Sequence, residues 1–303
     1  MRAGGMGLAL LAALASIGCG GSDAASDSAN LSAKEAEIEA TVDLDVLEAS
    51  GLGMRTVDGS LQLLSVGDDS TDLALADDPD GFDALDISDV ADGSDWEAVA
   101  GDDDGLVVIL REFPPALLVL DADLSTLLVE VALDASAYPD LDWDEDSNVL
   151  AEGLVLMANG HVLVAKELDP PALIEFGPAD ESPSGFATGD AASSFPVPTA
   201  DTFEALHVWP LSSSAASTAP DISDLAVSPT GELHLLSDEG RLIALVESNL
   251  GPTEDHAKLT RTWKLPKKAK HPEGLLFLPD ETPLVAIDST SKKKNGFVLE
   301  PLD

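Results

Sequence analysis

Short apolar runs separated by turn residues follow one another along most of the chain. In five places a small or acidic residue opens an apolar run, a turn follows, and a second apolar run comes after it. Most of these turns contain Asp-Gly, Asn-Gly or Thr-Gly, and Asp-Gly and Asn-Gly favour a tight β-hairpin because they tolerate positive φ. The pattern therefore predicts five hairpins, which begin at Ser50, Glu97, Glu152, Ser223 and Glu273.

Two further apolar runs follow several of these hairpins. Four short strands in roughly 40 residues, repeated along a chain, are typical of the blades of a β-propeller. The sequence thus predicts an all-β propeller of about five four-stranded blades over residues 36–303. The last copy is one strand short, and residues 37–42 are expected to supply that strand and close the ring. The alternative is six blades.

The spacing of the repeats is uneven. Their first residues are 47, 55, 71 and 50 positions apart, counted from 50 to 97, 152, 223 and 273. The long third interval is rich in Ser, Ala, Pro and Gly, which indicates surface insertions at about 178–202 and 211–220. A degenerate sixth blade in this interval is the alternative explanation of the excess.

An acidic residue recurs at a constant place in four of the five copies. It lies 15 positions after the first residue of the second to fifth copies, whereas the first copy shows no matching acid. In a propeller the first strand of each blade lines the central channel, so equivalent positions form rings around the axis. One ring is expected to contain Glu97, Glu152 and Glu273, and another Glu112, Glu167, Asp238 and Asp288.

Carboxylates crowded around one axis repel each other. Protonation, a Lys or Arg partner, or a hard cation with oxygen ligands relieves the repulsion. These seven residues are therefore predicted metal ligands, with Ca²⁺ as the expected ion. In the alternative, each Glu accepts hydrogen bonds from backbone N–H groups of the next blade and latches two blades together.

Two further side chains are candidate ligand-binding residues. His271 directly precedes the start of the last copy, Pro272-Glu273-Gly274, and is expected at a channel mouth. Trp96, beside Glu97, could form a stacking wall for a ligand. The alternatives are an ordinary surface histidine and an aromatic wedge between blades.

The N-terminus has the organisation of a bacterial lipoprotein signal. Arg2 provides a positive start, residues 6–17 are apolar but too short to span a bilayer, and small residues precede Cys19. Residues 1–18 are therefore predicted to be a signal peptide, Cys19 the lipidated residue and 19–35 a flexible tether. Gly20 after the Cys favours the outer membrane over the inner membrane. The protein is expected in the cell envelope, attached to the membrane through this lipid anchor.

Composition agrees with a folded acidic domain. The chain has 57 acidic and 15 basic residues, a formal charge of −42, and 45% hydrophobic residues, which is too many for an acidic disordered chain. Such a charge repels phosphate backbones, so nucleic acid is excluded as a partner. Residues 258–303 nevertheless hold 9 of the 15 bases and only 6 acids. They either relieve self-repulsion or form a docking patch for an anionic surface.

Two long segments carry a family resemblance. The runs VLVAKELDPPALIEF (162–176) and LHLLSDEGRLIALV (233–246), with the Ser-Gly-Leu and Glu-Gly-Leu starts, resemble the SdiA-regulated, YjiK-like propeller family. The resemblance covers about residues 45–300. It implies a propeller of the cell envelope, and it implies no established reaction.

Two functions remain open from the sequence. The first is a monomeric envelope module that binds an unidentified ligand or protein partner, with calcium as an expected cofactor. The second is a metal-dependent hydrolase of the phytase-like esterase or lactonase type, which rests on fold analogy alone. The chain has no Gly-x-Ser-x-Gly and no His-Glu-x-x-His motif, and no catalytic residue is assigned. The binding module is therefore the favoured interpretation.

Overall fold

The computed structural model of the chain describes Met1 and residues 33–143 and 150–302. Strands dominate this part of the chain. The only helices in the described ranges are a single 3₁₀ turn, η1 (Pro139–Leu141), and the four-residue α1 (Ser213–Ala216). Neither is long and apolar enough to cross a membrane. The predicted all-β class is confirmed.

The described strands form five sheets, which contain eight, five, four, four and two strands. The eight-stranded sheet consists of two successive runs of four strands, and we describe the four larger sheets as five units. The first unit contains β3 (Ala49–Val57), β4 (Ser60–Gly67), β5 (Asp72–Ala76) and β6 (Asp83–Asp86). The second contains β7 (Trp96–Gly101), β8 (Val107–Arg111), β9 (Ala116–Leu120) and β10 (Leu127–Asp134). The third contains β11 (Ala151–Leu156), β12 (Val162–Lys166), β13 (Ala172–Gly177) and β15 (Thr202–Pro210).

The fourth and fifth units use N-terminal residues at their outer edges. The fourth contains β16 (Asp224–Val227), β17 (Leu233–Ser237), β18 (Leu242–Val246) and β20 (Leu259–Lys264), with the short β1 (Lys34–Glu35) paired to β20. The fifth contains β21 (Pro272–Phe277), β22 (Pro283–Ile287), β23 (Gly296–Leu299) and β2 (Ile38–Val42). Lys34 and Glu35, which the sequence assigned to the tether, are thus part of a sheet. Residues 2–18 of the predicted signal peptide and Cys19 lie outside the described residues.

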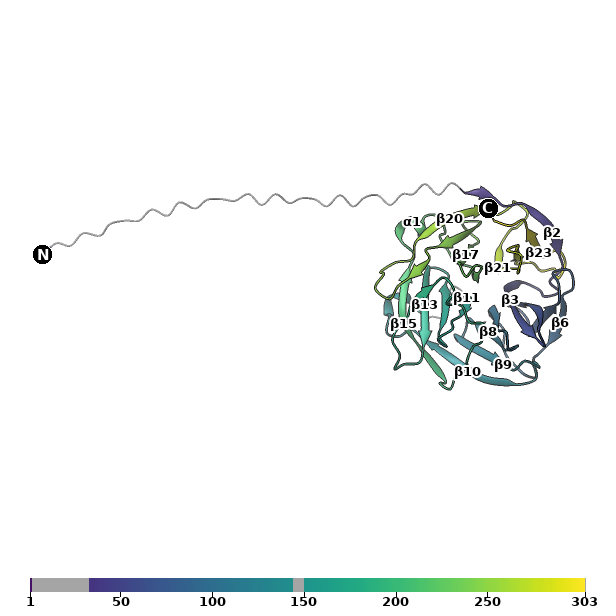
Figure 1. Cartoon of the computed structure of the whole chain (residues 1–303), viewed down its shortest axis with the longest axis horizontal. Helices are drawn as coiled ribbons and strands as arrows, with labels where there is room; N and C mark the ends of the chain where they lie inside the picture. Colours follow the sequence, from purple (N-terminus) through teal and green to yellow (C-terminus); the bar gives the residue numbers. More distant parts are fainter. Residues whose placement is uncertain (2–32, 144–149, 303) are drawn as a thin grey trace.

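The five units surround a common centre, toward which each turns its first strand (Figure 1). These first strands, β3, β7, β11, β16 and β21, contact one another in cyclic order, and β21 contacts β3. The fold is therefore a β-propeller. A parallel pairing of β10 with β15 also joins the second and third units into one eight-stranded sheet.

Glycines allow the first strands to approach closely. A Cβ at Gly51 would lie 2.7 Å from the Cα of Ala98, and one at Gly153 would lie 2.6 Å from the nitrogen of Leu225. Both distances are shorter than a side chain can accept, and only glycine lacks a Cβ. The glycine that recurs at the second position of the repeat therefore has a packing reason.

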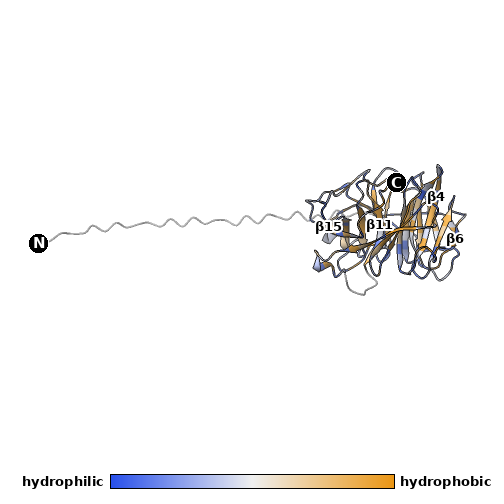
Figure 2. Cartoon of the chain, turned by 90° about the horizontal axis from the view of Figure 1, so that it is seen from below, coloured by the Kyte–Doolittle hydropathy of each residue, from blue (hydrophilic) through white to orange (hydrophobic). Residues whose placement is uncertain are grey.

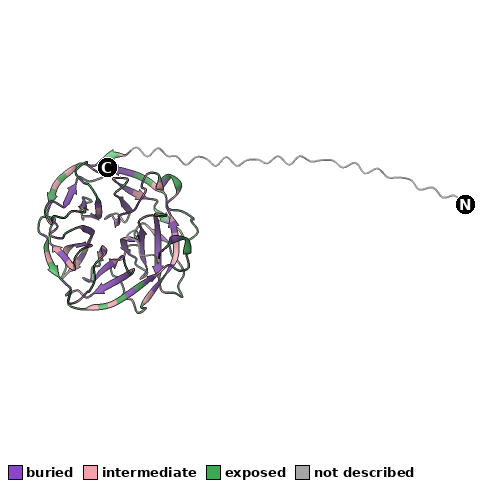
Figure 3. Ribbon diagram, turned by 180° about the vertical axis from the view of Figure 1, so that it is seen from behind, coloured by how far each residue is buried: buried purple, intermediate pink, exposed green. Residues whose placement is uncertain are grey.

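Burial is greatest in the middle strands of the units and lowest in the outer strands. Every residue of β9 and β12 is buried, whereas the outer strand β10 alternates between buried and exposed positions. Figure 3 shows mostly buried strands within the ring and mixed ones at its periphery, and Figure 2 shows orange, hydrophobic strands between blue, hydrophilic loops. Middle strands are covered by neighbouring units on both faces, which explains their continuous apolar runs.

The insertion at 178–202 crosses from the third unit to its neighbours. Its one described strand, β14 (Phe186–Ala187), pairs with β19 (Asn249–Leu250) beside the fourth unit. On the other side, a carboxylate oxygen of Asp102 accepts a hydrogen bond from the N–H of Phe195 at 2.9 Å. The insertion therefore lies across one end of the propeller.

Candidate functional site

Four of the five first strands contain a shift in pairing register near their start. The shift falls at Ser50, Glu97, Glu152 and Glu273, the first residues of their sequence repeats. A β-bulge leaves one residue unpaired and redirects its side chain. In the fourth unit β16 begins at Asp224 and pairs without a shift. Local backbone geometry thus sets three glutamates apart from the regular sheet.

The redirected side chains line a cavity of about 210 Å³ at one end of the channel. Nine of its ten lining residues are acidic and the tenth is Ser50, so no Lys, Arg or His is among these described lining residues. We call the three bulge glutamates, Glu97, Glu152 and Glu273, the ring carboxylates. The other acids of the lining are Glu48, Asp68, Asp95, Glu112, Glu167 and Asp288.

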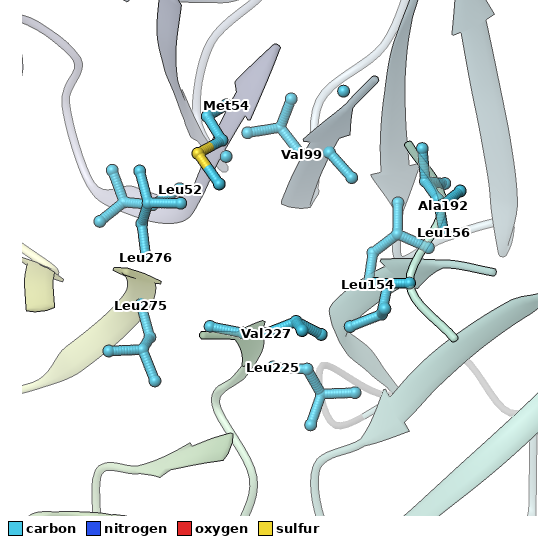
Figure 4. Close-up of a pocket in the computed structure, with 16 residues that line it drawn as sticks. Leu52, Met54, Val99, Leu154, Leu156, Ala192, Leu225, Val227, Leu275 and Leu276 are labelled. Atoms are coloured by element: carbon cyan, nitrogen blue, oxygen red, sulfur yellow. The ribbon is translucent and has the colours of Figure 1, made fainter. Parts of the chain in front are cut away.

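Directly below the acidic cavity the channel is apolar. Two positions further along the first strands lie Leu52, Val99, Leu154, Leu225 and Leu275, which line a second cavity of about 140 Å³. Figure 4 shows these side chains around one space, together with Leu156 and Ala192. Successive side chains on one face of a strand are roughly 7 Å apart. The ring carboxylates therefore lie next to an apolar layer of the channel.

This environment raises the pKa of the ring carboxylates. Burial is the largest cause of the raised pKa at Glu97 and Glu152, and each is also repelled by neighbouring glutamates. Burial, followed by the charges of Asp238 and Glu167, raises the pKa of Glu273 to about 8. The pKa of Glu167 is raised to about 7, again mainly by burial. Near neutral pH the cavity favours a bound proton or a bound cation.

The ring carboxylates have no hydrogen-bond partner within the described part of the chain, whereas two other deep acids do. An oxygen of Glu112 accepts the N–H of Leu150 at 2.8 Å, which links the second unit to the third. Asp224 accepts the N–H of Leu275 in the fifth unit at 2.6 Å and its neighbour Leu225 at 2.7 Å. The latch expected as the alternative role is thus present at Glu112 and, unforeseen, at Asp224.

Six of the seven predicted metal ligands line this one cavity. The exception is Asp238, which lies at the rim with Oδ2 3.2 Å from Nδ1 of His271. His271 is well exposed, with 68% of its side-chain surface accessible, and does not line the cavity. Trp96 is fully buried in the apolar core between the first two units and offers no face to a ligand. Trp96 therefore packs as an aromatic wedge between two units, which was the alternative to a ligand-binding role.

Sequence reasoning missed three acids of the cavity, and for Asp68 the reason is geometric. The N–H of Asp68 donates to the carbonyl of Glu48, and in the second unit the N–H of Glu112 donates to the carbonyl of Asp95. Asp68 is therefore the residue of the first unit that is equivalent to Glu112. The first hairpin is longer than the others, which moves this acid from 15 to 18 positions after Ser50. Asp68 Oδ1 is buried without a hydrogen-bond partner.

The other two missed acids share a position, two residues before the bulge. Glu48 and Asp95 both have positive φ there, 46° and 61°, and so does His271 at 50°. A left-handed conformation is uncommon for residues other than glycine, and such positions cluster at functional sites. The equivalence of these positions could have been found by aligning the repeats two residues further upstream.

One group of acids has the spacing of a metal site. The carboxylate oxygens of Glu48, Asp68 and Asp69 lie within 4.8 Å of one another at the edge of the cavity. Ca²⁺ takes six to eight oxygen ligands, and Zn²⁺ sites usually contain Cys or His. The donors in this group are carboxylates alone, so they fit a hard divalent cation.

A ring of sheets with carboxylates around one end of its axis defines the class: a β-propeller with an acidic channel entrance. The chain belongs to the SdiA-regulated family, whose family model matches residues 26–282, well over half of its length. The resemblance found in the sequence is thereby confirmed. No curated protein matches the chain at a significant level.

Solved structures show a similar fold at low sequence identity. The glutaminyl cyclase of Myxococcus xanthus is 10% identical, with a TM-score of 0.52 over 88% of this chain and 96% of that one. The aldose sugar dehydrogenase of Streptomyces coelicolor is 11% identical (TM-score 0.47, 88% and 97% covered). The virginiamycin B lyase of Staphylococcus aureus is 10% identical (TM-score 0.40, 81% and 66% covered). At this level of identity a likeness shows the fold alone.

Proposed function

We propose that the protein is a lipid-anchored binding module of the cell envelope whose acidic cavity binds a divalent cation, Ca²⁺ before others. One observation carries the proposal. Three glutamates at equivalent bulges of three units face one cavity, lie against an apolar floor and have no hydrogen-bond partner in the described structure. Such groups are costly to keep ionised unless a cation neutralises them.

The architecture supports a cation held on the propeller axis. The first strands bring acids from distant parts of the chain to one point, and the apolar layer beneath strengthens every electrostatic interaction there. The group Glu48, Asp68 and Asp69 offers oxygen ligands where the cavity opens. The described lining supplies oxygen ligands for a metal, and we therefore propose binding as the function of the cavity.

We further propose that the five units are the blades of a five-bladed propeller and that β2 closes the ring. The pairing of β2 with β23 and the cyclic contacts of the first strands support this count. A lipid on Cys19 would attach a monomeric domain to the envelope, at the outer membrane by the residue that follows Cys19. The ligand or protein partner would then meet the propeller at the membrane surface.

Metal analysis of the domain, with thermal melting in Ca²⁺ and in EDTA, tests the cation proposal. We expect bound divalent cation and a melting temperature that falls on chelation, because a ligand that binds only the folded state stabilises it. Glu152→Gln with Glu273→Gln should remove most of this increment. Glu39→Gln with Glu300→Gln, two exposed positions, is the matched control. A protein without metal whose melting ignores EDTA would refute the proposal.

A further inference from the structure

The insertion that follows β13 reaches the channel at the end away from the ring carboxylates. Its residues Ala191 and Ala192 line the apolar cavity, and the N–H of Ala192 donates to the carbonyl of Leu156 at 2.8 Å (Figure 4). The N–H of Asp103 donates to the carbonyl of Ser193 at 2.9 Å. These contacts fall at the ends of β11 and β7, and the ring carboxylates lie at the starts of the first strands. The insertion therefore borders the opposite end of the channel.

A buried histidine ties the insertion to the third unit. His161 directly precedes β12 and is only 2% exposed. Its Nδ1 lies 2.6 Å from Oε1 of Glu175 on β13, and its Nε2 lies 2.9 Å from Oε2 of Glu181 in the insertion. Nδ1 also lies 3.0 Å from the side-chain nitrogen of Asn159. Glu175 and Glu181 are the charged groups of the described chain that act on His161, and we call these three residues the histidine clasp.

Glu175 is the inner anchor of the histidine clasp. Its side chain is fully buried. Besides the His161 contact, its carboxylate accepts the N–H of Ser184 at 2.9 Å and that of Gly185 at 2.8 Å. The hydroxyl of Ser184 donates to the same carboxylate at 2.9 Å. One carboxylate of β13 thus holds the histidine and two residues of the insertion.

The two contacts of His161 require two protons on its ring. Each ring nitrogen faces a carboxylate, and only the imidazolium form has an N–H on both nitrogens. In a neutral ring, a lone pair faces one of the two carboxylates. Glu175 keeps its bonds from Ser184 and Gly185, whereas the side chain of Glu181 is 53% exposed and has no other hydrogen-bond partner among the described residues. Loss of the second proton therefore releases Glu181.

The histidine clasp has a defined pH range. Its hydrogen bond to Glu175 is the largest cause of the raised pKa of His161, and it outweighs the opposite effect of burial. Burial acts to raise the pKa of Glu175, but hydrogen bonds, the one from His161 first, lower it. The contribution of His161 to stability is complete below its unfolded pKa of about 6.5 and is lost as the pH rises through the raised value. The clasp is therefore closed in weak acid and opens in alkali.

We infer that residues 178–202 form a cover over the apolar end of the channel, and that His161 fastens this cover reversibly because it holds Glu175 and Glu181 together only while its ring carries two protons. Local opening of the cover exposes the apolar cavity behind Ala191 and Ala192. No member of the histidine clasp lines the acidic cavity, so the inference does not depend on the proposed cation.

Amide hydrogen exchange of the full chain, followed by NMR at pH 6 and at pH 8.5, tests this inference in the wild type and in Glu181→Ala. The amide of Gly185 reports the fastening and that of Ala192 reports the cover, because they bond to Glu175 and Leu156. At pH 6 we expect both amides to be about tenfold less protected in the variant. At pH 8.5 the two proteins should agree, since the wild type has then lost the same contact.

The comparison at equal pH removes effects on the whole fold, and amides of β12 should be the same in both proteins. Asp180→Ala, at the exposed neighbouring acid, is the matched control and should behave as the wild type. An equal difference at both pH values would mean a role without a switch and would overturn the inference. Lower protection of Gly185 with unchanged Ala192 would also overturn it, because the fastening would then not control the cover.

NMR titration of the histidine rings tests the proton directly. We expect His161 to titrate above pH 6.5 in the wild type and at a lower pH in Glu181→Ala, which removes one of its two carboxylates. The exposed His271 should titrate alike in both proteins. A neutral His161 ring in the wild type at pH 6 would refute the proposed fastening.

Discussion

Asp224 and Glu152 lie in neighbouring first strands and differ in one respect. Both carboxyls have a pKa well above the usual range, and burial is the largest cause for each. Asp224 accepts two backbone N–H groups, one of them from the fifth unit, whereas Glu152 accepts none among the described residues. Burial and charge alone therefore do not show which acid holds the fold and which is available to a ligand. The hydrogen-bond partners do.

The difference arises from position within the repeat. Asp224 is the second residue of its copy, where other copies have glycine or alanine, and Ser223 takes the first position. Its carboxylate points at backbone rather than into the cavity. Glu152 occupies a bulge, which turns its side chain toward the axis. The fourth unit thus provides a latch, and the second, third and fifth provide the ring carboxylates.

The pH dependence of stability tests the ring, and it should be the largest effect. Folding raises the pKa of Glu273 from 4.5 to about 8 and that of Glu167 from 4.5 to about 7. The folded state then binds more protons than the unfolded state, so the free energy of unfolding in EDTA falls as the pH rises from about 4.5 to about 8. The two shifts alone correspond to about 8 kcal/mol, and solvent reaches both side chains in part, so we expect a fall on the order of 4 kcal/mol, measured by urea unfolding.

Excess Ca²⁺ should reduce this pH dependence, because the cation replaces the protons that the carboxylates lose. The comparison between EDTA and Ca²⁺ at pH 8 is therefore decisive. A free energy of unfolding that is flat from pH 5 to pH 8 in EDTA would contradict the electrostatic description of the cavity.

Removal of the latch tests the other side of the comparison. Asp224→Ala leaves the N–H of Leu275 without its partner in a buried place, and we expect a loss of about 3 kcal/mol in the free energy of unfolding. The loss should be the same in Ca²⁺ and in EDTA, since Asp224 does not line the cavity. Asp224→Asn keeps one acceptor oxygen and should lose less. A loss that appears only in Ca²⁺ would move Asp224 into the cation site.

Neutralising one ring carboxylate should raise the free energy of unfolding in EDTA, whereas removal of the latch lowers it. Glu273→Gln removes a repelled acid from the cavity, so we expect the free energy of unfolding in EDTA at pH 7 to rise by about 2 kcal/mol. The same variant should lose stability relative to the wild type in Ca²⁺. Chemical unfolding under both conditions gives the two signs, and Glu300→Gln is the exposed control. Destabilisation in EDTA would mean that Glu273 is a latch after all.

Glu112→Gln should have the smallest effect of the four changes. Glutamine keeps an oxygen that can accept the N–H of Leu150, so the link between the second and third units survives. We expect a change of less than about 1 kcal/mol in the free energy of unfolding. Glu112→Ala should cost more, because the buried N–H then lacks a partner. Equal results for the two variants would show that the hydrogen bond contributes little.

Much of the site could be predicted because the repeat carries it. A constant offset of 15 residues identified Glu112, Glu167 and Asp288 as neighbours of the ring, and all three line the cavity. The same rule placed Asp238 there, but its backbone N–H bonds to the Asp221 carboxylate and its side chain lies at the rim. It missed Asp68 because the first hairpin is longer. A constant offset counts residues along the chain. Two residues occupy equivalent places in space at that offset only when their hairpins have the same length.

The sequence by itself determined the all-β fold, the repeat and the concentration of acids at its recurring positions. These follow from local rules: apolar runs and turn residues define strands, and repetition makes equivalent positions meet at an axis. Only the tertiary structure decided which acids find a hydrogen-bond donor and which face the cavity without one. That choice depends on atoms from neighbouring units, tens of residues apart in the chain, whose approach no local pattern records.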